Sequence, residues 1–262
     1  PPDAFAPEGQ NWGFSPLDPL RLRASGYQYF IQLLRNNLRY GGAIRIDHVM
    51  ALFRLFWIPR GLPPAMGTYV HYRDDELLAI LALESVRAKA LVIGEDLGTV
   101  PDWVRDRLGP AGVLSYRGFY FEREHWGGWK PPTHYPAQAL AVVTTHDLPT
   151  LVGYWEGVDI DTRSTLGLFP SEDARNAMWA ERHREKAGIL TALKSQGLLP
   201  AGVSEDPAQV PIMTTELMEG IHQYLARTPA WMVLANIDDV IGTRVQANLP
   251  GTVDQHPNWC RK

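Results

Sequence analysis

A chain of 262 residues that is 45% hydrophobic can bury one large core without requiring a second domain. Its 25 Lys and Arg residues are scattered among 29 Asp and Glu residues and form no basic run, which argues against nucleic acid as a partner. The single cysteine, Cys260, excludes an internal disulfide, and no segment approaches the roughly 18 apolar residues of a membrane span, so we expect a cytoplasmic protein without a membrane partner.

Strand and helix patterns alternate along the chain. In order, we predict a helix at 25–39, a strand at 43–47, a helix at 74–88, a strand at 91–95, a helix at 101–108, strands at 113–121 and 140–147, helices at 171–197 and 212–228, and a strand at 231–237. The strand segments are continuously apolar, which is typical of strands buried on both faces. The alternation predicts an α/β domain with a parallel sheet, either doubly wound or closed into a barrel.

Three predicted strands end in a carboxylate: Asp47, Glu95 and Asp147. Side chains at the carboxyl ends of neighbouring parallel strands meet in one crevice, and in barrels this is the catalytic face. The chain has no glycine-rich phosphate or dinucleotide fingerprint in a strand–turn–helix context, which weighs against a cofactor-binding fold. A single strand-end acid is more often a helix cap or a salt-bridge partner, but three together predict a catalytic site.

Paired carboxylates in a crevice can cleave glycosidic bonds. One ionised acid attacks the anomeric carbon while a second, protonated acid donates its proton to the leaving oxygen. Arg45 lies two residues before Asp47, on the same strand face, and would keep that acid ionised. The alternative is a metal site in which the carboxylates act with His48 and His146, but a fixed Arg45 charge raises the cost of binding a cation there.

Four blocks of sequence, "RIDHVMAL", "IGEDLGTVP", "TTHDLPT" and "NLPGT…HPNW", together resemble the 4-α-glucanotransferases, or amylomaltases, which are relatives of the α-amylases. The resemblance runs through the whole chain. It implies a (β/α)8 TIM barrel of the glycosidase type. It also implies a retaining transferase that moves α-1,4-glucan segments between malto-oligosaccharides, or to glucose, without a cofactor and without a metal.

The resemblance also implies roles for individual residues. Asp47 would be the nucleophile, Glu95 the general acid/base and Asp147 the acid that stabilises the transition state. Arg45 and His146 would contact the sugar beside them. The opening segment, residues 1–14, resembles the family's substrate-covering loop, and in it the substrate-binding positions would be Asp3, Phe5, Gln10 and Trp12.

Five strands are fewer than the eight that a barrel needs. We therefore expect an incomplete barrel carrying the fourth to eighth strands, with residues 1–262 as the C-terminal portion of a catalytic domain and 150–230 as a mostly helical segment between the last two strands. Open edges would favour self-association, and we expect the isolated chain to be inactive or nearly so. Two other functions stay open, an α-glucan hydrolase and a non-catalytic carbohydrate-binding fragment. In the loops, Tyr69, Trp126 and Trp129 could be sugar platforms or simply pack on their own backbone.

Overall fold

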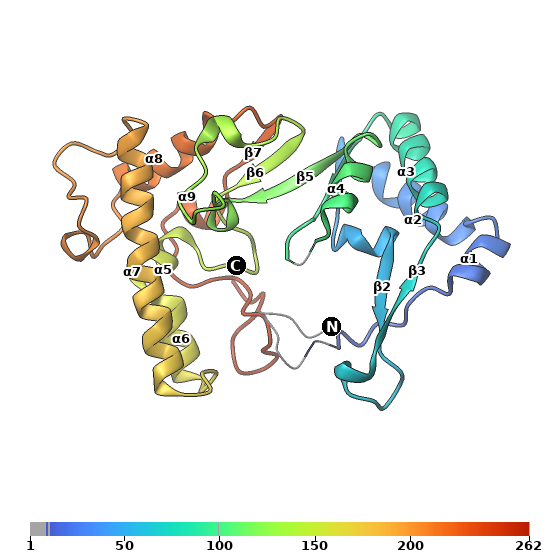
Figure 1. The fold of residues 1–262 in the computed structure, drawn as a ribbon, viewed down its shortest axis with the longest axis horizontal. Helices are drawn as coiled ribbons and strands as arrows, with labels where there is room; N and C mark the ends of the chain where they lie inside the picture. Colours follow the sequence, from blue (N-terminus) through green and yellow to red (C-terminus); the bar gives the residue numbers. More distant parts are fainter. Residues whose placement is uncertain (1–8, 10, 99, 262) are drawn as a thin grey trace. The chain divides into compact units, whose positions relative to one another are not determined.

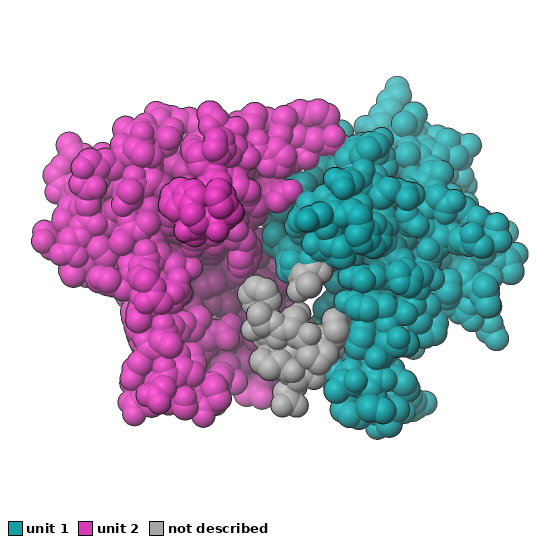
Figure 2. Space-filling model, viewed as in Figure 1, with its two compact units in different colours: residues 1–116 teal, residues 117–262 magenta. Residues whose placement is uncertain are grey.

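The computed structural model describes residues 9, 11–98 and 100–261, and the chain forms two compact units, residues 1–116 and 117–262 (Figure 2). Among the described helices, none combines the length and the apolar character that crossing a membrane would need. The secondary structure of each unit is shown in Figure 1.

The first unit is built on three parallel strands. Strand β4 (Leu91–Gly94) pairs with β1 (Ala43–Ile46) on one side and with the start of β5 (Val113–Gly118) on the other. The helices are α1 (Pro19–Ala24), α2 (Gln28–Leu38), α3 (Asp74–Ala88) and α4 (Asp102–Leu108), with 3₁₀ turns at Val49–Leu52 and Pro64–Met66. An antiparallel hairpin, β2 (Arg54–Trp57) and β3 (Thr68–His71), follows β1 in the chain.

The second unit contains the parallel pair β6 (Ala139–Val142) and β7 (Met232–Leu234). Its helices are α5 (Leu151–Glu156), α6 (Val158–Thr165), α7 (Glu172–Ser195), α8 (Thr215–Ala226) and α9 (Ile237–Val240), with 3₁₀ turns at Phe119–Phe121, Pro132–His134 and Pro207–Gln209. Each unit has its own core. In the second, apolar residues of α7 and α8, including Leu190, Leu193, Leu217 and Leu225, are fully buried in one cluster with Ala141 of β6.

The predicted elements are largely confirmed. Helix α3 has the predicted bounds, and α7 begins after Ser171, whose side chain accepts the N–H of Ala174 at 3.1 Å as an N-cap does. The helix predicted at 25–39 is wrong at its start. Gly26 and Tyr27 both have positive φ, 63° and 59°, and this break separates α1 from α2.

Burial of every strand on both faces is wrong for two strands. All four residues of β6 are buried, as predicted, but the residues of β1 alternate between exposed and half-buried, and those of β7 are half-buried or exposed. Two of the three strand-end acids lie one residue beyond their strands, while Asp147 lies five residues beyond β6. The hairpin β2–β3 was not predicted, because proline and glycine residues between its strands mask the strand pattern.

Candidate active site

Asp47 leaves the end of β1 in an ion pair. Nη1 of Arg45 lies 2.7 Å from Oδ1 of Asp47, and the Arg45 guanidinium carbon lies 5.2 Å from the centre of the Tyr116 ring. The ring therefore helps to hold the cation beside the carboxylate. The Asp47 side chain is 75% exposed, so Asp47 does not pay the desolvation cost expected of a buried strand end.

Glu95 lies at the end of the neighbouring strand and is buried. The strand register pairs Ile46 with Gly94, and the Glu95 N–H donates to the Ile46 carbonyl at 2.8 Å, so Asp47 and Glu95 leave adjacent strand ends. One Glu95 oxygen accepts the backbone N–H of His48 at 2.8 Å and the other accepts that of Leu97 at 2.7 Å. A carboxylate has about four lone-pair sites, so both oxygens can still accept a proton or a sugar hydroxyl.

Asp96, the residue after Glu95, fixes the end of β4 through hydrogen bonds to its carboxylate. Its buried carboxylate accepts the N–H of Tyr116 at 2.8 Å and the Nε–H of Arg105 at 2.9 Å. These bonds tie the end of β4 to β5 and α4. Sequence reasoning missed Asp96, although it stands in the quoted block "IGEDLGTVP" directly after the predicted acid.

His48 does not continue the strand that carries Arg45. Its φ is +44°, and it precedes the 3₁₀ turn at Val49–Leu52. The Trp12 ring packs edge-on against the imidazole with the ring centres 5.3 Å apart. Burial lowers the pKa of His48, against the smaller opposing effects of Glu95 and Asp47, so the imidazole is neutral at neutral pH.

In the second unit, Asp147 has both carboxylate oxygens engaged. Nε2 of His146 lies 3.1 Å from Oδ2, and Nδ2 of Asn248 donates to Oδ1 at 2.6 Å. The Trp259 ring lies 5.3 Å from the His146 ring, centre to centre. Sequence reasoning assigned no role to Asn248 or Trp259, although both lie in the quoted block "NLPGT…HPNW".

Asn258 fixes the loop that carries Asn248. Its Oδ1 accepts the N–H of Leu249 at 2.8 Å, and its Nδ2 donates to Oγ1 of Thr252 at 3.0 Å. The Trp259 N–H donates to the Ala247 carbonyl at 2.9 Å, which closes the loop on both sides of Asn248. The block "NLPGT…HPNW" is thus a folded support for the Asp147 carboxylate rather than an open loop.

Three predicted sugar contacts, Asp3, Phe5 and Gln10, lie outside the described residues. Trp12 is exposed, as a sugar platform would be, and its ring contacts His48. Trp126 is also exposed, whereas Trp129 is buried and stacks on Phe119 at 4.4 Å. Trp129 is therefore a core residue.

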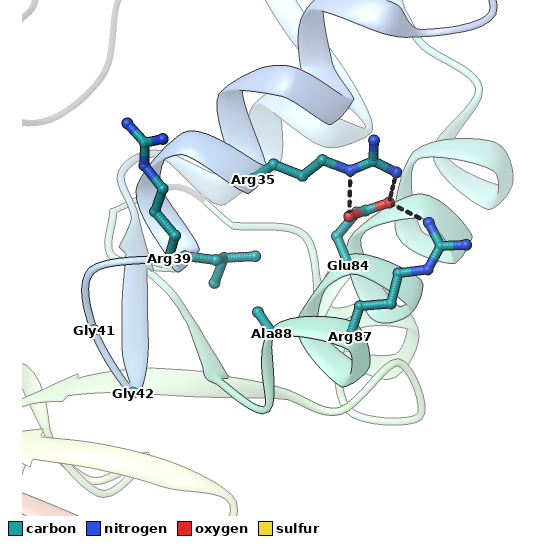
Figure 3. Close-up of a pocket in the computed structure, with 8 residues that line it drawn as sticks. Arg35, Arg39, Gly41, Gly42, Glu84, Arg87 and Ala88 are labelled. Carbon is teal, nitrogen blue, oxygen red and sulfur yellow. Dashed lines mark hydrogen bonds and ion pairs between the residues drawn. The ribbon is translucent and has the colours of Figure 1, made fainter.

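A surface cavity of about 580 Å³ in the first unit is not lined by Asp47 or Glu95. It opens between α2 and α3 at Gly41 and Gly42, before β1 begins, whereas Asp47 follows the other end of that strand (Figure 3). In it, Glu84 accepts hydrogen bonds from Arg35 and Arg87, which makes this an ion cluster between helices. Within the described part of the chain, no group of three His, Cys, Asp or Glu side chains could hold a metal ion.

The model of the 4-alpha-glucanotransferase family matches residues 1–262. The 4-alpha-glucanotransferase of Haemophilus influenzae is 40% identical over 262 residues, which are 100% of this chain and 37% of that protein. That of Mycobacterium tuberculosis is 40% identical over 265 residues, covering 99% of this chain and 35% of the relative. The chain thus spans little more than a third of the length of these two relatives.

Two solved amylomaltase structures are similar to this chain in fold. The crystal structure of amylomaltase from Corynebacterium glutamicum matches 99% of this chain and 37% of its own, with a TM-score of 0.91 at 40% identity. The amylomaltase from Streptococcus agalactiae, solved in complex with acarbose, matches with a TM-score of 0.72 at 18% identity, which speaks for the fold alone. The predicted fold class, a (β/α)8 TIM barrel present in part, is confirmed.

Proposed function

Since this chain belongs to the 4-alpha-glucanotransferase family, we propose that it carries the catalytic carboxylates of an enzyme that transfers α-1,4-glucan segments with retention at the anomeric carbon. The observation that supports this best is the placing of Asp47, with its Arg45 partner, beside Glu95 on adjacent strand ends. Retaining glycosidases need two carboxyl groups of this kind, about 5–5.5 Å apart.

In the first step, a carboxylate oxygen of Asp47 attacks the anomeric carbon of the donor glucan. The glycosidic bond breaks, its electron pair goes to the leaving oxygen, and Glu95 gives its proton to that oxygen. The products are a covalent glycosyl-aspartate and a shortened glucan. Arg45 favours this step because a neighbouring cation keeps the attacking carboxylate charged.

In the second step, Glu95 takes the proton of an acceptor 4-hydroxyl as the acceptor oxygen bonds to the anomeric carbon. The bond to Asp47 breaks and its carboxylate is restored. Asp147 would accept hydrogen bonds from sugar hydroxyls and strengthen them in the transition state, a role that rests on the resemblance of "TTHDLPT". Asn248 and His146 would hold that carboxylate in place.

The substrates that fit this reaction are malto-oligosaccharides as donors, with malto-oligosaccharides or glucose as acceptors. Acarbose, a pseudo-oligosaccharide, is bound by the Streptococcus agalactiae amylomaltase. In this chain, the exposed rings of Trp12 and Trp259 could stack on sugar faces beside His48 and His146 respectively.

We propose further that the 262-residue chain alone transfers glucan poorly. Asp47 and Asp147 are both accessible to water, with 75% and 47% of their side chains exposed. An active site that transfers to sugars rather than to water must exclude water and orient the acceptor. Orientation alone can supply several kcal/mol of the reduction in barrier.

The proposal is tested with maltotriose. The test compares the isolated chain with a chimeric transferase, in which this chain replaces the matching segment of the Haemophilus influenzae relative. We expect the chimera to produce a ladder of longer and shorter glucans, and its Asp47→Asn variant to lose the ladder by at least a thousandfold. A chimera that releases only shortened sugars would instead be a hydrolase. One that folds and binds maltotriose without reaction would be a carbohydrate-binding module.

A further inference from the structure

Asp239 is a fully buried carboxylate that accepts hydrogen bonds from both ends of the segment carrying Asp147. It lies in α9, which follows β7, the parallel neighbour of β6. Its Oδ1 accepts the N–H of Leu151 at 2.6 Å, and its Oδ2 accepts the hydroxyl of Thr144. The carboxylate thereby closes the turn of residues 144–151, and Asp147 stands in the middle of this turn.

Neighbouring contacts fasten the same two segments together. Nδ2 of Asn236, the N-cap of α9, donates to Oγ1 of Thr144 at 3.1 Å. Beyond α9, the Arg244 carbonyl passes so close to Gly153 of α5 that a Cβ there would lie 2.3 Å from the oxygen. Arg244 also pairs with Glu156 at 2.6 Å. The segment from Asn236 to Arg244 therefore contacts both the turn at 144–151 and the helix α5 that follows it.

The chemistry of the partners explains why a carboxylate stands at this position. The Leu151 N–H can only donate, and the Thr144 hydroxyl, which already accepts from Asn236, donates its proton to Asp239. An asparagine would turn one of the two acceptors into a donor. Burying this charge is costly, and burial raises the pKa of Asp239 against the opposing effects of the hydrogen bonds from Thr144 and Leu151. Asp238, one residue earlier, pairs with Arg261.

We propose that Asp239 is a positioning residue for Asp147. By joining Thr144 to Leu151 it fixes the turn, and so it holds the Asp147 carboxylate where this accepts the hydrogen bond from Asn248. The inference rests on the proposed function only for its catalytic meaning, since the turn and its bonds belong to the chain itself. In the transferase, a loosened turn would lower the turnover number more than it would weaken ground-state binding of the donor.

The test is made by NMR on the 262-residue chain, without substrate. Two signals are followed: hydrogen exchange of the Leu151 amide, and the shift of the Asn248 side-chain amide, whose Nδ2 donates to Asp147. The Asp147→Ala variant defines the Asn248 shift when that partner is lost. The variants tested are Asp239→Ala and the milder Thr144→Val, which removes only the hydroxyl bond. Asp238→Asn is the matched control on the same helix.

We expect Asp239→Ala to speed Leu151 exchange at least tenfold and to move the Asn248 signal at least half of the way to its position in Asp147→Ala. Thr144→Val should move both signals in the same direction by less, and it carries the test if Asp239→Ala does not fold. Asp238→Asn should leave Leu151 unchanged. If Asn248 stays in place, or if the amides of α7 and α8 lose protection as much as Leu151 does, Asp239 is a general stabiliser and the proposal is overturned. Because no sugar is present, this NMR result can be interpreted even if the glucan-transfer proposal fails.

Discussion

The Arg45 guanidinium lies 2.7 Å from the Asp47 carboxylate, and both side chains come from the same end of β1. This pair supports the proposal that Asp47 is the nucleophile. The guanidinium also lies 5.2 Å from the Tyr116 ring, on a neighbouring part of the same unit. The Arg45 guanidinium thus contacts both the Tyr116 ring and the Asp47 carboxylate, so replacing Arg45 should lower the activity.

Arg45→Lys in the chimeric transferase should lower kcat/KM for maltotriose roughly tenfold, which corresponds to about 1.4 kcal/mol. Lysine keeps the charge but loses the planar group that reaches Asp47 while lying over Tyr116. The measurement is initial-rate kinetics. Arg54→Lys, in the hairpin of the same unit, is the control and should have no effect. Equal rates for Arg45→Lys and the parent would remove Arg45 from the mechanism.

Trp12→Ala should raise the pKa of His48 towards its ordinary value. Burial is the main cause of the lowered pKa, and removing the ring that covers the imidazole lets water solvate its charged form. The acids Glu95 and Asp47 then act in the same upward direction. The measurement is an NMR titration of His48 in the isolated chain, with Trp12→Phe as the control that keeps an aromatic ring. An unchanged titration would mean that other groups bury His48.

Glu84→Gln should destabilise the first unit by about 1–3 kcal/mol, the usual effect of losing hydrogen bonds to a charged group. Arg35 and Arg87 hold this buried carboxylate between α2 and α3, and the bond from Arg35 is the main cause that lowers the pKa of Glu84 (Figure 3). A lowered pKa in the folded state means that this stabilisation is complete above the unfolded pKa of about 4.3 and is lost as the pH falls through the folded value.

Urea unfolding at pH 7 and pH 3, followed by exchange of the α2 and α3 amides, checks both parts of this prediction. The parent chain should lose more stability between the two pH values than Glu84→Gln does. The same pH dependence in both proteins would contradict the assigned role of the cluster.

Gly153→Ala should destabilise the second unit by about 1–3 kcal/mol, as overpacking usually does. The added Cβ would meet the backbone oxygen of Arg244 at 2.3 Å and Oγ1 of Thr150, the N-cap of α5, at 2.9 Å. Backbone cannot move aside as a flexible side chain would. Gly109→Ala is the control, because its Cβ would lie at an ordinary 3.6 Å from the Arg105 carbonyl. If thermal unfolding shows the same loss of stability for Gly153→Ala and Gly109→Ala, the close approach of the Arg244 carbonyl to Gly153 is contradicted.

The parts of the fold that follow from local patterns were predictable from the sequence. The bounds of α3 and the Ser171 cap of α7 rest on neighbouring residues, and so they match. The exposure of β1 and β7 could not be read from their apolar sequences, because burial depends on which other segments cover a strand.

The same distinction applies to the site. Asp47, Glu95 and Asp147 stand out because each follows an apolar run, and the ion pair of Arg45 follows from the two-residue period of a strand. The bond from Asn248 to Asp147 joins residues that are 101 positions apart, and the bond from the Leu151 N–H to Asp239 spans 88 positions. Neither spacing has a local signature, so the supports of Asp147 emerge only from the folded chain.

The nucleophilic role of Asp47 is tested most directly by trapping the covalent intermediate. The Glu95→Gln variant of the chimeric transferase is treated with α-maltosyl fluoride, whose fluoride leaves without a proton, so that the first step proceeds while the second lacks its base. The account predicts that mass spectrometry finds a maltosyl group on the peptide containing Asp47, and none when Asp47→Asn is added. A maltosyl group on a different residue, or fluoride release without any adduct, would contradict it.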